Sequence, residues 1–163
     1  MRPHPTTSLL LLASLFGWAG LISGISFLEA PLKFTAPHIT VPLGLGIGRI
    51  VFQALNKVEL VLATVAVLSA WRLRVPGHVA ATLCLLGAIL LLQTFWLLPA
   101  LDVRALALLA GRPAPPSSLH TTYIALEVVK LLTLLLTGSW AFRWMLRNAG
   151  TGFALPRLSQ VRA

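Results

Sequence analysis

The chain has 163 residues, of which 57% are hydrophobic and only 10% are charged, and its mean hydropathy is +0.87. Because a soluble domain usually carries about 25% charged residues, this composition excludes an ordinary soluble domain and indicates an all-α integral membrane protein. The formal net charge of +9 comes from basic residues that stand singly or in pairs, mostly at the ends of apolar runs. This spacing favours membrane topology and contact with anionic lipid, and it argues against nucleic-acid binding.

The first apolar run covers residues 8–29 and predicts the first spanning helix. About 20 residues are enough to cross roughly 30 Å of hydrocarbon. A single Arg2 ahead of an apolar run also resembles a signal peptide, but this run is longer than a usual signal core and has no clear A-x-A cleavage site. We therefore expect a first helix that is not cleaved.

The segment that follows the first run is rich in proline. Pro31, Pro37 and Pro42 each remove a backbone donor and restrict the residue before them, which argues against a regular helix through this segment. We expect an irregular or re-entrant connection packed against the bundle, since such backbone needs protein or water to satisfy it. Glu29 and Lys33 lie four residues apart across Pro31.

The second span is expected over residues 48–71 and opens on GLGIG, residues 44–48. No strand precedes these glycines and no Lys-Ser/Thr follows them, so a phosphate-binding loop is poorly supported. The spacing of Gly44 and Gly48 is more typical of close helix packing. An interfacial Trp71, two arginines and a Pro-Gly turn end the span.

The third span is expected over residues 78–98, with Gln93 and Thr94 near its far end and Pro99 as its stop. Residues 100–111 read as a short amphipathic helix along the interface. Ser117 or Ser118 is expected to cap the fourth span, residues 118–141. The membrane domain thus covers residues 1–147, and residues 148–163 are expected to form a flexible cytoplasmic tail.

Four spans place both termini and the turn after the second helix on one side of the membrane. That side carries most of the basic residues: Arg2, Arg72, Arg74, Arg143, Arg147, Arg157 and Arg162. By the positive-inside rule we expect both termini in the cytoplasm, most simply at a bacterial inner membrane.

Helices two and four both begin on the opposite side, and both carry polar residues in their first halves. At about 100° per residue, the polar residues of each helix fall on one flank. With Glu29, they predict an outward-facing polar pocket built from Glu29, Arg49, Asn56, Glu59, His120, Tyr123, Glu127 and Lys130. Because an unpaired charge in hydrocarbon costs about 2.5–3.5 kcal/mol, Glu59, Glu127 and Lys130 should pair with each other or with Arg49 and Lys57.

Ionisable groups within a membrane are candidates for function, so small-solute or ion transport or binding is the first hypothesis, with Glu59, Glu127 and Lys130 as the binding groups. A purely structural ion network is equally open for the two glutamates. The second hypothesis is an accessory or assembly subunit of a larger membrane complex. Four helices are few for a transporter, so we expect a homo-oligomer or a larger complex, in contact with membrane lipids.

Haem or metal binding through His120 is the least supported hypothesis, because its only plausible partners on that side are His38 and Glu29. His78 starts the third helix on the other side of the membrane. Enzyme motifs such as H-E-x-x-H, G-x-S-x-G and C-x-x-C do not occur. We expect no catalytic residue, no cofactor and no metal.

Three stretches carry a family resemblance: GISFLEAPLKFTAP (24–37), GLGIGRIVFQALNKVE (44–59) and SLHTTYIALEVVKLL (118–132). They resemble the transmembrane protein 205-like family. The shared features are Pro31 and Phe34 after the first helix, Gly48 and Phe52 opening the second, and His120 opening the fourth. The resemblance implies a small four-helix membrane protein of no settled biochemical activity, and it supplies no mechanism.

Overall fold

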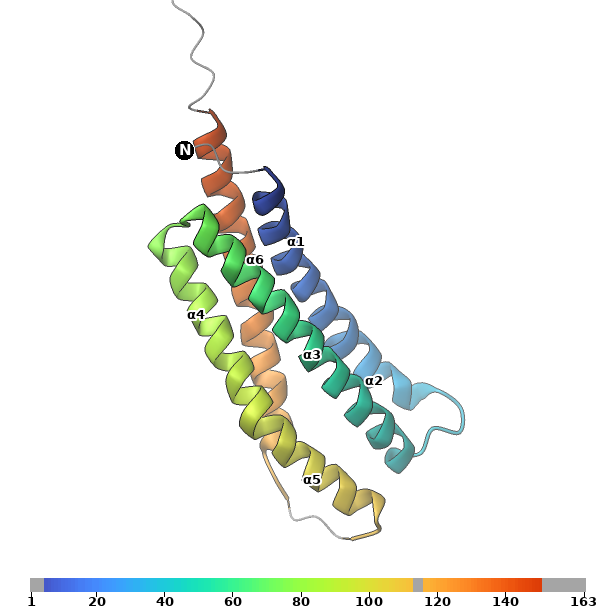
Figure 1. Cartoon of the computed structure of the whole chain (residues 1–163). Coiled ribbons are helices and arrows are strands. Elements are labelled where there is room, and N and C mark those ends of the chain that lie inside the picture. The colour runs from blue at the N-terminus through green and yellow to red at the C-terminus, as the bar shows by residue number, and fades with distance from the viewer. Residues whose placement is uncertain (1–4, 113–115, 151–163) are drawn as a thin grey trace, which may run out of the picture.

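The computed structural model describes residues 5–112 and 116–150, and most of this part of the chain is helical (Figure 1). Its elements are α1 (Pro5–Ile22), the π-helical segment η1 (Ser23–Glu29), α2 (Ala30–Leu32), the 3₁₀ turn η2 (Lys33–Thr35), α3 (Val41–Leu73), α4 (Gly77–Leu92), the π-helical segment η3 (Gln93–Leu97), α5 (Leu98–Leu109) and α6 (Leu119–Gly150). They join into four long helices that are long and apolar enough to cross a membrane. The predicted all-helical, four-helix architecture is confirmed.

The first long helix does not end at Pro31, so the predicted break there is wrong. The helix continues through η1 and α2 to Thr35. Pro31 stands directly after the π-helical segment, whose i→i+5 hydrogen bonds already interrupt the regular ladder where the proline has no N–H to donate. Only residues 36–40 remain as an irregular connection, and α3 already begins at Val41 with Thr40 as its cap.

The third long helix likewise passes Pro99, which was predicted to end it. Pro99 lies in the first turn of α5, again directly after a π-helical segment. The expected interfacial helix over residues 100–111 is therefore the end of one continuous helix from Gly77 to Leu109. Gly111 follows in the left-handed conformation, at φ 70°, which is a common way to end a helix.

The fourth long helix begins where it was predicted and ends later. The Ser117 hydroxyl accepts the backbone N–H of Leu119 at 3.2 Å, as expected of a cap. The helix then continues to Gly150, so it includes the first residues of the predicted tail. Residues 151–163 of that tail lie outside the described part of the chain.

Neighbouring helices run in opposite directions, as predicted. Figure 1 shows the start of α1, the α3–α4 turn and the end of α6 at one end of the bundle. The α2–α3 connection, α5 and the start of α6 lie at the other end. α1 and α4 each pack on both α3 and α6, so α1 and α4 occupy opposite corners of the bundle.

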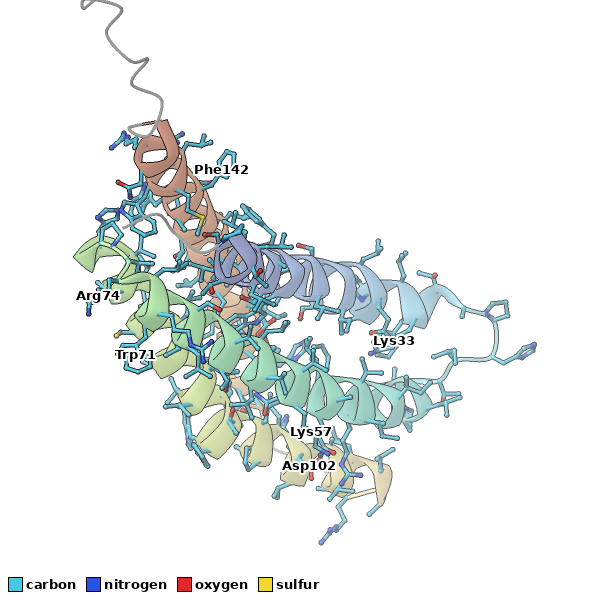
Figure 2. All side chains as sticks on the ribbon, turned by 45° about the horizontal axis from the view of Figure 1, so that its top comes forward. Lys33, Lys57, Trp71, Arg74, Asp102 and Phe142 are labelled. Atoms are coloured by element: carbon cyan, nitrogen blue, oxygen red, sulfur yellow. The ribbon has the colours of Figure 1, made fainter. Side chains whose placement is uncertain are left out.

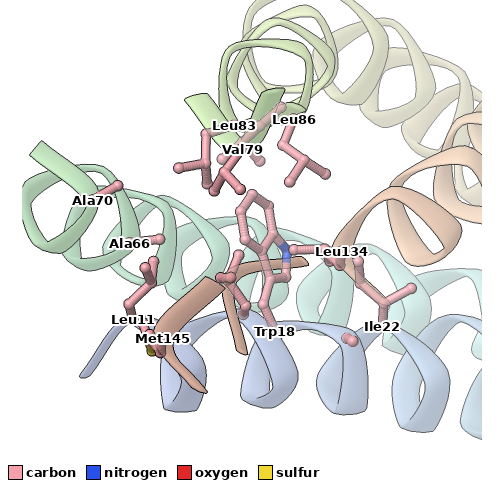
Figure 3. Packing of buried hydrophobic residues seen from close by; sticks show 14 residues of the cluster. Leu11, Trp18, Ile22, Ala66, Ala70, Val79, Leu83, Leu86, Leu134 and Met145 are labelled. Carbon is pink, nitrogen blue, oxygen red and sulfur yellow. The ribbon is translucent and has the colours of Figure 1, made fainter. Parts of the chain in front are cut away.

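The apolar core lies in the half of the bundle nearer the α3–α4 turn. Figure 3 shows the Trp18 ring of α1 directed towards Leu83 and Leu86 of α4, beside Leu134 of α6. Trp18 and Leu86 are only 1% exposed. The other half of the bundle holds the polar side chains described below.

Gly44 and Gly48 face the end of the first long helix, which confirms that this spacing serves close packing. A side chain at Gly44 would overlap the Phe34 ring, and the Lys33 ammonium lies 3.0 Å from where a Cβ of residue 48 would stand. Gly46, which lies between them on α3, has open space where its Cβ would stand. The two glycines therefore allow η2 to lie directly on α3.

We expect Gly44→Leu to lower the free energy of unfolding by about 1–3 kcal/mol, since the new side chain must displace Phe34. The measurement is SDS-induced unfolding of the purified protein in mixed micelles. Gly46→Leu is the matched control and should be neutral or slightly stabilising, because leucine favours helix over glycine. Equal losses in the two variants would contradict this packing.

Candidate functional site

Three charged side chains meet at the centre of the bundle and form the central ion cluster, which consists of Glu59, Glu127 and Lys130. The Lys130 ammonium lies 2.6 Å from Glu59 Oε1 and 2.7 Å from Glu127 Oε1. All three side chains are at most 1% exposed. The sequence-based expectation that these residues pair with each other is confirmed.

Two of the long helices carry the charges of the cluster. Glu127 and Lys130 are three residues apart on α6 and therefore share a face. Glu59 comes from α3, so the cluster ties together the two helices between which α1 and α4 pack.

The other two long helices supply neutral donors. Trp18 Nε1 of α1 donates to Glu59 Oε1 at 2.7 Å. Ser26 Oγ donates to Glu127 Oε2 at 2.8 Å, and Gln93 Nε2 donates to Glu127 Oε1 at 2.9 Å. Ser26 lies in η1 and Gln93 in η3, and π-helical segments of this kind occur frequently at functional sites. Every long helix thus contributes at least one side chain to the central ion cluster or to the hydrogen bonds around it.

A cavity of about 440 Å³ adjoins the cluster. Most of its wall is apolar, and it is called the polar cavity below for the charged side chains among its lining residues. It lies among the end of the first long helix, the first half of α3, α5 and the start of α6. Glu127 is the member of the central ion cluster that lines it, together with Ser26 and Tyr123. Tyr123 is 4% exposed and packs edge-on against Phe52, with 5.3 Å between ring centroids.

Two further ion pairs lie at the polar cavity. Lys33, Arg49 and Asp102 line it, and Glu29 lies just outside the lining. Lys33 pairs with Glu29 at 3.4 Å, and its ammonium also lies over the Phe52 ring. Arg49 of α3 pairs with Asp102 of α5. Figure 2 places Lys33 and Asp102 towards the opposite end of the bundle from Arg74.

The chain contains only four acidic residues, and all of them belong to these ion pairs and the central ion cluster. This concentrates the acidic charge in one half of the bundle.

Most of the predicted pocket residues are brought together, but their roles differ. Asn56 is buried and bonds Thr94 at 3.0 Å, so it joins α3 to η3 and does not line the cavity. His120 is exposed and lines the polar cavity. His78 packs against Trp140, far from His120 along the bundle. In residues 5–112 and 116–150, no three His, Cys, Asp or Glu side chains group closely enough to hold a metal ion.

Several polar residues of the site were missing from the predicted pocket, among them Trp18, Ser26, Lys33, Gln93 and Asp102. Trp18 and Ser26 lie in an apolar run with no polar stripe to mark them. Asp102 was placed in an interfacial segment because Pro99 was expected to end the helix before it. Helical continuity past Pro99 is the feature that brings Asp102 to Arg49.

The Arg49–Asp102 pair is about a quarter to a third exposed, so we expect Asp102→Asn to cost about 1 kcal/mol or less. The arginine left behind can still be solvated. The loss should shrink further as salt is added, because the pair is partly accessible to ions. SDS unfolding at low and high salt measures both effects, and a large loss that salt does not change would contradict this view of the pair.

The fold and the site define a class: an all-helical protein with four helices of membrane-spanning length around a buried ion cluster and an adjoining polar cavity. Comparisons with protein-family models, with curated proteins and with solved structures find no significant match to this chain.

Proposed function

We propose that the chain is an integral protein of a bacterial inner membrane, with both termini in the cytoplasm. Helices of 30–33 residues are about 45–50 Å long at 1.5 Å per residue, which exceeds the roughly 30 Å of a hydrocarbon core. Large apolar side chains such as Phe95 and Trp71 are exposed on the outside, at 77% and 75%, where lipid would cover them. Arg72, Arg74 and Arg143 belong to the end that the positive-inside rule assigns to the cytoplasm.

The polar cavity binds a small solute or ion, as a step in transport or as a receptor site. The observation that carries this proposal is the position of Glu127, which belongs to the central ion cluster and also lines the cavity. A cluster that only fixed the register of the helices would need no adjoining cavity. Charged side chains within a membrane commonly mark such pathways.

The test is a solute screen on the protein purified in mild detergent. Thermal unfolding is followed with a panel of organic ammonium ions, carboxylates, sugars and neutral aromatics. At least one class should raise the unfolding temperature, because a ligand present at 100 times its Kd stabilises the folded state by about 2.7 kcal/mol. The shift should be lost in Glu127→Gln and kept in Lys57→Gln, which changes an exposed lysine outside the cavity lining.

Native mass spectrometry of the same sample addresses the second hypothesis, an accessory subunit. We expect a homo-oligomer, since four helices are few for a transporter. If no solute shifts the unfolding temperature and a distinct protein co-purifies in fixed ratio, the solute-binding proposal is wrong and the chain is a subunit of a larger complex. The resemblance to the transmembrane protein 205-like family fits either result.

A further inference from the structure

The central ion cluster contains one more carboxylate than it has cations. Glu59 and Glu127 both contact the single ammonium of Lys130. At the outer part of the site, by contrast, Glu29 has Lys33 and Asp102 has Arg49. If both carboxyls of the cluster were ionised, one negative charge would remain in a place that is almost fully buried. Buried charge of this kind is strongly unfavourable unless a proton or a cation balances it.

A second observation points to a bound proton at the same place. The side-chain oxygen of Gln93 is buried and has no hydrogen-bond partner in the described part of the chain, while its amide nitrogen donates to Glu127. Gln93 is 0% exposed. A buried carbonyl oxygen requires a donor, and a protonated carboxyl beside it carries one, either directly or through a water.

The walls of the polar cavity are suited to a positive charge. Phe27, Phe34, Phe52 and Tyr123 all line it. The Lys33 ammonium already lies 5.6 Å from the centre of the Phe52 ring and 5.8 Å from that of Phe34, so these rings accept an ammonium ion at cation–π distance. Glu127, which also lines the cavity, shares the single Lys130 ammonium with Glu59 and so belongs to the pair of carboxyls that has one cation too few.

We propose that the polar cavity binds an organic ammonium cation, and that this cation displaces one proton from the central ion cluster. This inference rests on the solute-binding function proposed above and names the class of solute. Without the cation, one of the two carboxyls holds a proton. When the positive charge of the ligand lies against Glu127, that proton leaves to water, so one positive charge enters as another departs. No bond other than O–H is broken and no electron is transferred.

Within the described part of the chain, the titratable groups around the site are the candidates for that proton. They are Glu29 and Lys33 from the first long helix, Arg49 and Glu59 from α3, Asp102 from α5, and His120, Tyr123, Glu127 and Lys130 from α6. Among the carboxyl groups, Glu29 and Asp102 each have a cation of their own, whereas Glu59 and Glu127 share one and so form the place where a surplus carboxyl needs a proton. The structure therefore assigns the exchanged proton to Glu59 or Glu127.

The probe is benzyltrimethylammonium, a quaternary ion without an N–H, so any proton released must come from the protein. Isothermal titration calorimetry at one pH, in two buffers of different ionisation enthalpy, gives both the affinity and the number of protons released. We expect about one proton per cation bound. Benzyl alcohol and benzenesulfonate share the aromatic ring but are neutral and anionic, and both should bind at least about tenfold more weakly and release no proton.

Three variants separate the parts of this proposal. Glu127→Gln and Glu59→Gln each remove the surplus carboxylate, and both should abolish proton release. Phe52→Leu keeps every charge but removes one ring, so it should weaken binding of the cation about two- to thirty-fold while proton release stays near one. Lys57→Gln is the matched control and should behave as the unchanged protein does.

The inference would be overturned if the cation bound without releasing a proton, if benzenesulfonate bound as tightly, or if the two glutamate variants kept the release. Unfolding curves of each variant establish that it is folded before it is titrated. If benzyltrimethylammonium does not bind but another class of solute stabilises the protein through Glu127, the solute-binding function stands and only the proposed class of solute is wrong. Should no solute bind, both proposals fail.

Discussion

Lys130→Met should lower the free energy of unfolding by about 3–5 kcal/mol, the largest loss expected for a single polar residue of this chain. Methionine preserves most of the length of the side chain but leaves Glu59 and Glu127 facing each other without the ammonium that both contact. SDS-induced unfolding in mixed micelles measures the loss. Lys57→Met is the comparison, because Lys57 is an exposed lysine on α3 outside the cluster; replacing it removes no partner of a carboxylate, so it should not lower the free energy of unfolding.

A double variant tests whether the loss comes from charge. Combining Lys130→Met with Glu59→Gln removes one of the two carboxyl groups that lose their shared ammonium, so it should recover part of the lost stability. Two residues that contributed independently would instead give additive losses. Additivity here would mean that the contacts of Lys130 with the two glutamates do not govern the stability of the bundle centre.

Trp18→Ala should cost about 3–5 kcal/mol, because it removes the largest side chain of the apolar core and also a hydrogen-bond donor to Glu59. Trp18→Phe keeps most of the packing and loses the donor, so about 1.5–3 kcal/mol is expected for a bond to a charged group. The difference between the two variants separates packing from hydrogen bonding.

Trp71→Ala is the matched control for the tryptophan series. Trp71 is 75% exposed and lies outside the core, so its removal should have little effect on unfolding in micelles. If Trp18→Phe were as neutral as this control, the Trp18–Glu59 hydrogen bond would contribute nothing to stability. The apolar packing of Trp18 in Figure 3 would then be its whole role.

The polar half of the bundle could be predicted because helical periodicity and burial cost act together. Glu59, Glu127 and Lys130 lie on the flanks that a 3.6-residue period assigns to them, and a charge buried in apolar surroundings needs a partner. The sequence left Arg49 and Lys57 open as alternative partners, and only the packed helices show that Lys130 is the cation that both glutamates contact. Because successive spans cross a membrane in alternating directions, the four apolar runs also predicted the direction of each helix.

The helix ends and the neutral donors could not be predicted, for a different reason. Local rules treat Pro31 and Pro99 as breaks, but each follows a π-helical segment whose shifted hydrogen bonds accommodate it within a continuous helix, and the sequence carries no clear signal for such a segment. Trp18 and Ser26 contact carboxylates from helices distant in sequence. The first apolar run contains few polar side chains, and only the packed arrangement of the four helices shows that Trp18 and Ser26 are the ones that face the central ion cluster.

Infrared difference spectroscopy of the protein in lipid tests most directly whether two carboxyls share one ammonium and one proton. At neutral pH the unchanged protein should show the carbonyl band of a protonated carboxyl that shifts in heavy water. Glu127→Gln and Glu59→Gln should each lose this band, while Lys57→Gln should keep it. Absence of the band from the unchanged protein would mean that both carboxyls are ionised, which would contradict the charge balance proposed for the central ion cluster.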